Sequence, residues 1–437
     1  MAGAIVNLYA LAGCSLSIDE KDNKIDSLIE PYLEGIYSGE WNEDEVLEKV
    51  YFHNAKVLLN GYEKGYGKKF FSPDWTLKDN NLLVRVQNNI FAFSGAKSYA
   101  EMKELRDAVH ENGNRLSFTD YKRRARKINV AYNENYLEAE RQVVIASGTQ
   151  GSRWLEIEEM ANEYPYLEYV TANDEHVREE HRRLHGIILP VNDPFWNSYY
   201  PPNGWRCRCS TRKRSEREYE RKKQRYESQN REALPNSEQA QKIAGKVVAK
   251  PFRHNVGTTE IFDRDGHPYF KANPSAKEMQ LSAVKHYGMK PVKQIYMDNR
   301  NLSAYKGEIK NEIDFIDYWK VLESHHGKPG EGFRLIDQKN KISASFDNDL
   351  KAKILDRERY SYFDEMIEVF TSPDEVWGTY NSSERYGTEF FNVYVKYYED
   401  RPIVLLVDLN GRVDSFYKLK TVEQVEQFRA GLLKQRR

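Results

Sequence analysis

Hydrophobic residues recur at helical spacing through much of the first 165 residues of the chain. Residues 20–65 carry two such stripes, the first formed by Ile25, Leu28, Ile29, Tyr32, Leu33 and Ile36, and the second by Val46, Val50, Ala55, Val57 and Leu58. The spacing resumes over residues 82–109 and again over residues 118–163. Because this spacing places one apolar face along a helix, residues 1–165 are expected to be mostly helical.

Glycine and proline divide the chain after these stripes. Gly61, Gly65 and Gly67 interrupt the second stripe, and the helix is expected to break there. Residues 186–211 combine Pro, Gly, Trp, Phe and both later cysteines, which predicts an irregular lobe. Residues 226–300 are polar and contain scattered prolines, a composition typical of a linker with some ordered pieces.

From about residue 301 the pattern changes to a mixture of helices and strands. Helical spacing is followed by alternating or apolar runs over residues 390–398, 403–408 and 413–419. The last two runs are joined by Asn410-Gly411, the strongest short signal for a hairpin. With a closing helix expected over 422–433, the pattern predicts an α+β domain of about 120 residues with an antiparallel sheet.

The expected fold is therefore multidomain, which agrees with a length of 437 residues because one ordinary core rarely grows so large. A mainly α N-terminal region covers residues 1–165, and an irregular Cys-containing lobe covers 166–225. A linker over 226–300 then leads to the small α+β domain at 301–437. No run approaches the roughly 18 apolar residues that a membrane span needs, so no membrane partner is expected.

The composition limits which binding partners and which cellular compartment are expected. The net charge of −1 gives no overall attraction to nucleic acid, so any such affinity must be local. Three cysteines cannot form a disulfide framework and suit a reducing compartment. The segment Leu11–Cys14 resembles a lipoprotein cleavage box, but no basic residue precedes Lys21. A buried or frayed N-terminal segment is therefore preferred over a lipidated one.

A strongly charged run occupies residues 212–225, with eight basic and three acidic residues. Charges spaced in this way are typical of a solvated helix with ion pairs between residues four apart. An interaction surface for nucleic acid or a protein partner is the alternative.

The first group of candidate site residues lies between residues 174 and 209. Asp174 and His181 are expected on one face of a helix, and Cys207 and Cys209 point the same way from an extended chain. These residues offer the nitrogen, sulfur and oxygen ligands that tetrahedral zinc prefers, so one structural zinc is a candidate cofactor. The alternative is that the cysteines are small buried hydrophobes and His181 a hydrogen-bonded core residue.

The same segment resembles a known family. The run from Asp174 through His181, then Leu189-Pro190-Val191, Pro194-Phe195-Trp196 and Pro201-Pro202-Asn203-Gly204-Trp205 with Cys207-Arg208-Cys209, is similar to the phage Mu F-like head-morphogenesis domain. The similarity extends over about residues 25–215. It implies a minor protein inside or near the capsid portal, with portal and capsid proteins as partners and phage DNA as a further candidate. It also implies a location in the capsid interior of the virion and in the host bacterial cytoplasm.

The second group of candidate site residues lies near the C-terminus. The segment at Ser372–Trp377, the tyrosine-rich strands and the segment at Asp414–Lys418 resemble phage-borne nuclease domains related to barnase, colicin E5 and RelE. This resemblance implies an endoribonuclease that needs no cofactor, with RNA as its partner. Unlike barnase-type enzymes, the expected strands contain no clear catalytic histidine.

Metal-free RNA cleavage needs a base, an acid and a cation that stabilises the charge on phosphorus. The candidate catalytic residues are Tyr394, Lys396, Tyr398, Glu375, Ser415 and Tyr417. The first three alternate along one strand, so they are expected to form an aromatic and cationic stripe on one surface. Each also has a structural alternative, such as a helix cap for Glu375.

Three functions follow for the whole chain. The leading hypothesis is a structural virion protein that carries a toxin-like ribonuclease domain. The second is a purely structural minor capsid protein whose C-terminal lobe only binds portal or DNA. The third, ranked last, is a metal-dependent hydrolase built on Asp174, His181 and the two cysteines, because zinc bound by two thiolates and a histidine is often a closed structural site.

Overall fold

The computed structural model describes residues 23–40, 48–68, 77–175, 177–230, 232–271, 284, 287–298, 302–340, 342–383 and 387–436. The Leu11–Cys14 motif lies outside these ranges. The chain divides into two compact units, residues 1–280 and residues 281–437, and each is described by itself. None of the described helices is long and apolar enough to cross a membrane.

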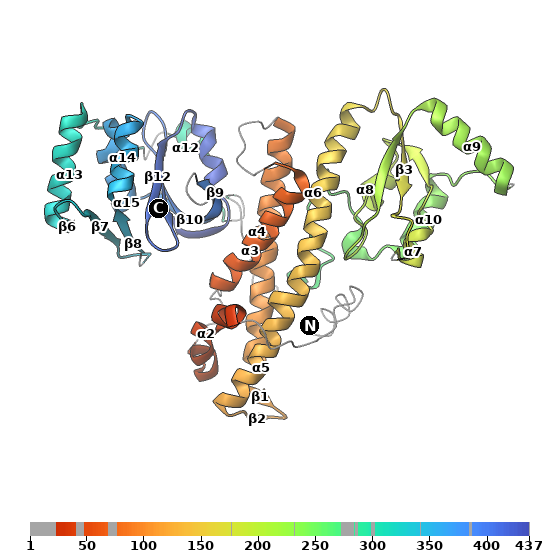
Figure 1. Ribbon diagram of the computed structural model, residues 1–437, viewed down its shortest axis with the longest axis horizontal. Coiled ribbons are helices and arrows are strands. Elements are labelled where there is room, and N and C mark those ends of the chain that lie inside the picture. Colours follow the sequence, from red (N-terminus) through yellow and green to blue (C-terminus); the bar gives the residue numbers. More distant parts are fainter. Residues whose placement is uncertain are drawn as a thin grey trace. The chain divides into compact units, whose positions relative to one another are not determined.

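Long helices build the first part of unit 1, as the hydrophobic stripes predict (Figure 1). They are α2 (Asn23–Ser38), α3 (Glu48–Tyr66), α4 (Leu77–Asp107), α5 (Phe118–Val130), the π-helical turn η1 (Ala131–Tyr136) and α6 (Leu137–Glu159). A two-residue hairpin of β1 (His110–Glu111) and β2 (Asn114–Arg115) joins α4 to α5. Between α4 and α6, the fully buried Lys97 and Glu140 form an ion pair of 2.6 Å.

The expectation that glycines break the second helix is wrong for Gly61 and Gly65 and is confirmed for Gly67, which directly follows the end of the helix at φ +83°. Helix α3 continues through Gly61 and Gly65 to Tyr66. A Cβ on Gly65 would lie 2.0 Å from the carbonyl oxygen of Ile145, and one on Gly148 of α6 would lie 2.6 Å from the carbonyl oxygen of Tyr62. These glycines therefore allow the α3 and α6 backbones to pack directly against each other.

A small lobe follows α6, built on an antiparallel sheet with strand order β4-β3-β5. Its strands are β3 (Tyr166–Val170), β4 (Ile188–Pro190) and β5 (Ser210–Arg214), and its short helices are α7 (Glu179–Arg182) and α8 (Phe195–Tyr199). The helix expected to carry both Asp174 and His181 is wrong in extent, because within residues 171–175 and 177–186 only the four residues of α7 are α-helical. Asp174 instead precedes it in irregular chain, directly after Asn173 at φ +55°.

The charged run forms the edge strand β5 and the helix α9 (Glu216–Asn230), which buries none of its residues. Arg214 pairs with Glu218 four residues later at 3.2 Å. Arg214 and Lys222 also both pair with the buried Glu168 of β3. The expectation of a solvated helix is confirmed, and the ion pairs of Glu218 and Lys222 join this helix to β5 and β3. A role as an interaction surface stays a prediction.

Much of the expected linker is packed into unit 1. Helix α10 (Ser237–Val247), the 3-10 turn η2 (Lys250–Phe252) and α11 (Pro268–Lys271) lie in this stretch. The ring of Phe262 stacks on Phe93 of α4, and its backbone exchanges two hydrogen bonds with the Asn89 side chain at 2.9 and 2.8 Å. The prolines thus mark turns of an ordered segment that covers α4, and the linker interpretation is wrong for residues 237–271.

Unit 2 is an α+β fold whose main sheet has five antiparallel strands in the order β12-β11-β10-β9-β13. These strands are β9 (Glu375–Ser383), β10 (Gly387–Lys396), β11 (Ile403–Asp408), β12 (Val413–Lys418) and β13 (Leu432–Arg436). The hairpin between β11 and β12 is confirmed, with Gly411 at φ +81°. The expected closing helix is wrong, since the 3-10 segment η4 (Val422–Phe428) is followed by β13, which pairs with β9.

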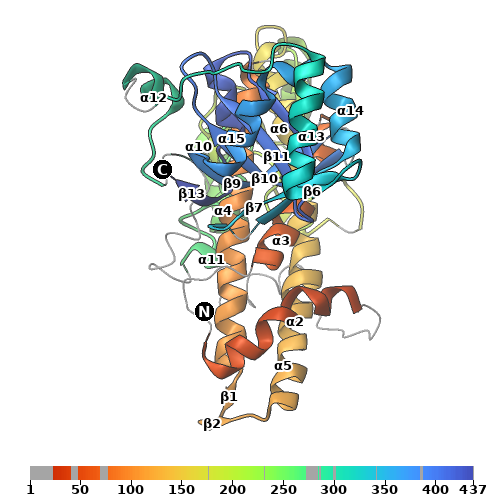
Figure 2. The same cartoon turned by 90° about the vertical axis from the view of Figure 1, so that its left-hand side faces the viewer.

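Both faces of the main sheet are covered. One face packs against α13 (Glu312–His326), α14 (Asn348–Asp356), α15 (Phe363–Thr371) and the small sheet of β6 (Gly327–Lys328), β7 (Gly332–Asp337) and β8 (Ile342–Phe346). Figure 2 shows these helices over the sheet. The other face packs against α12 (Val292–Asp298) and η4. The central strands are consequently buried on both sides.

Candidate metal centre

Two short segments of the lobe in unit 1 bring three metal-ligating residues together. His181 lies in α7, and Cys207 and Cys209 lie in the irregular chain that leads into β5. All three side chains are buried, and each offers a ligand atom within 4.8 Å of the others. Both cysteines are free thiols.

The distances within this group fit a single metal ion. His181 Nδ1 lies 3.7 Å from Cys207 Sγ and 3.6 Å from Cys209 Sγ. A tetrahedral zinc ion with Zn–S of about 2.3 Å and Zn–N of about 2.05 Å would place nitrogen and sulfur about 3.6 Å apart. The same distances also suit hydrogen bonds between thiol and imidazole. The three side chains can therefore keep these positions with or without a metal ion.

The two thiols differ in proton affinity. The pKa of Cys207 is well below its usual range, chiefly because it accepts a hydrogen bond from Cys209 and also contacts His181. The pKa of Cys209 is raised by its hydrogen bond to Cys207 and by burial. The hydrogen bond between the two sulfurs thus shifts their pKa values in opposite directions, and a metal ion that binds both as thiolates would displace their thiol protons.

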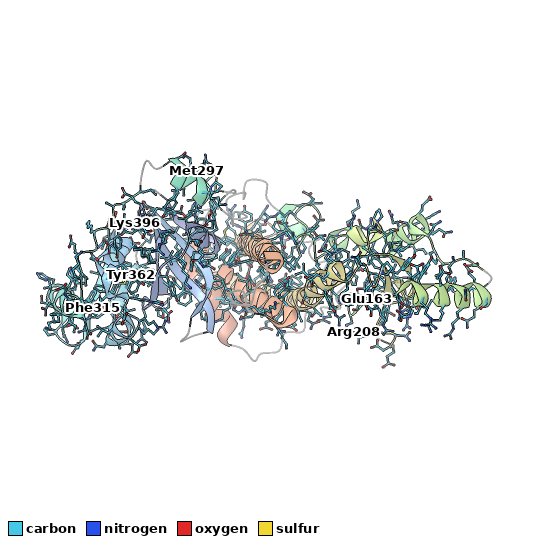
Figure 3. The ribbon with its side chains drawn as sticks, turned by 90° about the horizontal axis from the view of Figure 1, so that it is seen from above. Glu163, Arg208, Met297, Phe315, Tyr362 and Lys396 are labelled. Carbon is cyan, nitrogen blue, oxygen red and sulfur yellow. The ribbon has the colours of Figure 1, made fainter. Side chains whose placement is uncertain are left out.

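Asp174, the fourth predicted ligand, does not belong to the group. Its carboxylate forms two hydrogen bonds of 2.7 Å with the Arg208 guanidinium. Arg208 is exposed at the edge of the lobe (Figure 3). This pairing occupies the carboxylate that the helical pattern had assigned to a metal, so the structure contradicts Asp174 as a ligand.

The loop before the cysteines packs closely on the side chains of Arg178 and His181. A Cβ on Gly204 would lie 2.8 Å from Arg178 Nη1, the flexible end of that side chain, and 3.6 Å from His181 Cε1, an ordinary van der Waals distance. Arg178 donates a hydrogen bond to the Trp205 carbonyl, and Trp205 is buried against Phe252. These contacts fix the turn that presents both thiols to His181.

A pocket of about 790 Å³ opens beside the three donors. It is lined by Gln142, Ile145, Ala146, Thr149, Gln150, Arg153, Val177, Arg178, His181, Arg206, Cys207, Arg208, Cys209 and Ser210. Among the described residues, this lining includes four arginines and no carboxylate. The sequence motif contains Arg206 and Arg208 between and beside the cysteines, but nothing in it points to Arg153, which comes from the distant helix α6.

The predicted catalytic stripe of β10 does not face solvent. Tyr394 and Tyr398 are fully buried, and Lys396 is 4% exposed. Their polar atoms have partners inside unit 2: Tyr394 donates to Asp337, Lys396 to the Ser372 carbonyl, and Tyr398 to the Glu365 carbonyl. The expectation of a surface stripe is wrong because α15 and the small sheet cover this face of the strand.

Glu375 is also buried, at the wall of a pocket of about 410 Å³ in unit 2. Its carboxylate accepts hydrogen bonds of 2.7 and 2.8 Å from Arg429, one of 2.8 Å from Trp377 and one of 2.9 Å from Tyr397. With four donors bound, it has no capacity left to accept a proton from a substrate. Its environment is that of a structural ion pair between β9 and the chain before β13.

Ser415 and Tyr417 lie on β12, away from Glu375. Arg359 donates to Ser415 Oγ at 3.3 Å and lies 5.0 Å from the centre of the Tyr417 ring. Next to them, Lys418 lies 3.7 Å from the centre of the Tyr305 ring. Ser415 is buried, whereas Tyr417 and Lys418 are partly exposed. The six predicted catalytic residues are therefore not gathered at one site, and their catalytic roles stay predictions.

Comparison with known proteins identifies the region that contains the His/Cys group. Residues 94–212 match the family model described as "Phage Mu protein F like protein". Over 60 residues the chain is 45% identical to the "Putative capsid assembly protein F" of Escherichia phage Mu, an alignment that covers 14% of each chain. Over 65 residues it is 43% identical to the "Mu-like prophage FluMu F protein" of Haemophilus influenzae, which covers 15% of this chain and 16% of that relative.

The chain thus aligns with only about a seventh of the length of these curated relatives. No solved structure matches it significantly. The resemblance to the Mu F-like domain is confirmed for residues 94–212, a stretch that runs from within α4 to within β5. The resemblance of the C-terminal unit to nuclease domains stays a prediction.

Proposed function

We propose that this protein acts in phage head morphogenesis as a minor capsid protein associated with the portal. The observation that carries this proposal is the match of residues 94–212, together with the name of the phage Mu relative, a putative capsid assembly protein. The matched segment includes part of α4, all of α5 and α6, and the lobe with the His/Cys group. Its proposed partners are portal and capsid proteins, and its proposed locations are the capsid interior and the host bacterial cytoplasm.

The test is to locate the full-length protein during assembly of the phage or prophage that encodes it. Purified procapsids and virions should contain the protein, and its deletion should reduce the yield of filled heads. A protein that is absent from both particles contradicts the proposal.

We further propose that His181, Cys207 and Cys209 bind one structural zinc ion per chain. The 3.6 and 3.7 Å distances from nitrogen to sulfur support this assignment, as does the burial of all three residues. Replacement of both Cys207 and Cys209 by serine should remove the zinc, as measured by metal analysis of the purified chain. Cys14→Ser is the matched control, because it removes the third cysteine and should leave zinc content unchanged.

As a second function, we propose that unit 2 is a ribonuclease. Its proposed site lies on the edge strand β12 and not along the buried stripe of β10. Arg359 lies over the Tyr417 ring, and the neighbouring Lys418 lies over the Tyr305 ring and pairs with Asp400 at 2.9 Å. Two partly exposed positions of β12 thus have a cation beside a tyrosine ring, which is the chemistry that binds phosphates and stacks bases. Full-length protein should then cleave cellular RNA in the presence of EDTA, and Arg359→Ala should reduce the rate. Arg334→Ala, at an exposed position of β7, is the control.

Intact RNA after incubation with the wild-type chain contradicts the ribonuclease proposal. The second whole-chain hypothesis then applies, in which the C-terminal unit only binds portal or DNA. The proposed role in head morphogenesis does not depend on this result.

A further inference from the structure

We propose that the pocket beside the His/Cys group binds a phosphate dianion and that a phosphate oxygen takes the fourth coordination position of the metal. This inference rests on the proposed metal centre. Among the described residues, only three metal-ligating side chains meet at this point. Zinc held by three protein ligands keeps a position open for an external ligand. All three donors line the pocket, so a ligand in the pocket could reach a metal ion that they hold.

The arginines of the pocket retain most of their hydrogen-bonding capacity. Arg153 donates to Ser210 Oγ, and Arg178 donates to the Trp205 carbonyl. Arg206 has no side-chain hydrogen bond or ion pair with any residue that the structure describes, and its backbone adopts φ +54°. Because a guanidinium carries five N–H donors, these groups can bind several oxygens of one anion.

The charge of the pocket favours a dianion. Zinc with two thiolates and a neutral imidazole carries no net charge. The four arginines of the lining contribute four positive charges, and Asp174 neutralises that of Arg208, which leaves three. A phosphate dianion matches this excess better than a carboxylate or a phosphodiester, each of which carries one negative charge. Planar guanidinium groups also suit tetrahedral phosphate oxygens in bidentate contacts.

The residues that line the pocket favour binding of a ligand over its hydrolysis. Metal-assisted hydrolysis needs a general base near the metal-bound water, commonly a carboxylate. No Asp or Glu lines the pocket within the described part of the chain, and the nearby Asp174 is already paired with Arg208. This removes the main support for the metal-dependent hydrolase that the sequence left open.

Two ligands carry the same phosphate dianion group. They are free inorganic phosphate and the terminal phosphomonoester of a nucleic acid. A pocket of about 790 Å³ has room for a phosphate with its attached sugar. An internal phosphodiester carries a single charge and is therefore expected to bind less tightly. The experiment below separates these sources by using the same oligonucleotide with and without a terminal phosphate.

The test uses the full-length chain loaded with cobalt(II), whose visible absorption reports its ligands. Inorganic phosphate should shift the cobalt spectrum, and calorimetry on the zinc form should give a matching affinity. Arg206→Gln should weaken phosphate binding about tenfold, which is the loss of about 1.4 kcal/mol. Arg212→Gln, an exposed arginine outside the lining, should bind phosphate as the wild type does.

The outcomes separate this proposal from the metal centre on which it rests. A chain that binds no metal overturns both. A chain that binds cobalt but shows no spectral change with phosphate keeps the metal centre and overturns the phosphate ligand. Acetate that binds as tightly as phosphate also overturns it. A 5′-phosphorylated oligonucleotide that binds more tightly than its unphosphorylated form identifies the nucleic-acid source, whereas equal weak binding of both, with phosphate bound, identifies the free ion.

Discussion

Two short stretches of this chain place alternating side chains on one side of an extended backbone. In one stretch these side chains line an open pocket, and in the other they are buried. Cys207 and Cys209 point together toward His181 and line an open pocket. Tyr394, Lys396 and Tyr398 also share one side of their strand, but that side is buried under α15 and the small sheet. Alternation therefore identifies residues that share a face, and it carries no information about what covers that face.

The position of each stretch in its sheet explains the difference. The cysteines precede β5, an edge strand of a three-stranded sheet, where loops from other elements can approach. Strand β10 is the central strand of five, and both of its faces need a cover because the sheet is packed on both sides. A lysine on such a strand is buried only with partners, and Lys396 has the Ser372 carbonyl and Glu368.

The largest expected effect is on the free energy of unfolding, and it tests whether Glu375 of unit 2 has a structural role. Glu375→Gln should lower the free energy of unfolding by about 3–5 kcal/mol, because Arg429 would remain buried beside a neutral amide. Glu426→Gln is the matched control, since it removes the other, partly exposed partner of Arg429 and should cost less than about 1 kcal/mol. Urea unfolding followed by tryptophan fluorescence measures both. A Glu375→Gln variant of full stability that has lost RNA cleavage would make Glu375 catalytic after all.

Removal of the metal should have the next largest effect, and only in unit 1. With free zinc at about 100 times its dissociation constant, binding stabilises the folded state by about 2.7 kcal/mol, and a chelator should remove this amount. Hydrogen exchange should show the loss in the lobe of residues 166–214 and leave unit 2 unchanged. Equal loss of protection in both units would contradict a local metal site.

A smaller effect is expected for Lys396→Met in unit 2. The variant removes the hydrogen bond to the Ser372 carbonyl and leaves that acceptor unpaired, at a cost of about 1–2 kcal/mol. The proposed RNA cleavage should be unchanged, because Lys396 is 4% exposed and its ammonium is held by the Ser372 carbonyl and Glu368. Lys418 lies in the same cross-strand row, with Ile403 between them, but is partly exposed. Lys418→Met, on β12, is the comparison that should affect cleavage. The reverse pattern would restore the strand stripe as the catalytic site.

The parts of the fold that depend on local pattern were predictable from the sequence. The stripes of apolar residues predicted α2 to α6, and Asn410-Gly411 predicted the hairpin of β11 and β12. Gly61 and Gly65 lie inside α3 against expectation, because a helix-breaking glycine and a helix-contact glycine have the same sequence signal until the partner helix is known. The final strand β13 was missed because its pairing with β9 joins segments more than 50 residues apart.

The candidate site shows the same limit. The short spacing of Cys207 and Cys209, with a histidine nearby in sequence, was enough to predict that three metal-ligating side chains meet. The fourth, Asp174, was wrong because the choice between a metal and Arg208 depends on where the loop places the guanidinium. Arg153 could not be predicted at all, because α6 reaches the pocket only through tertiary packing.

The smallest expected effect is a pH dependence of the free energy of unfolding of unit 2. It tests whether the sheet face near Glu365 is buried or solvated. Burial, and then the hydrogen bond and charge of the neighbouring Asp364 carboxyl, raise the pKa of Glu365 from 4.5 to about 7. Between these values the folded state holds a proton that the unfolded chain has lost. The free energy of unfolding of unit 2 should therefore fall as the pH rises from about 5 to about 7, and then level off.

Glu365→Gln should flatten this dependence. The amide oxygen can still accept the backbone hydrogen bonds of 2.9 and 2.8 Å that Lys306 and Gly307 donate, but the side chain no longer ionises. Urea midpoints at about pH 5 and about pH 8 measure the change, with the exposed Glu308→Gln as the control. A wild-type midpoint that does not change over this range would mean that Glu365 ionises as a solvated carboxyl does, because a group with the same pKa in both states contributes no pH dependence. The face of the sheet that carries Lys396 and Tyr398 would then be accessible to water, and the contrast with the open pocket of the lobe would no longer hold.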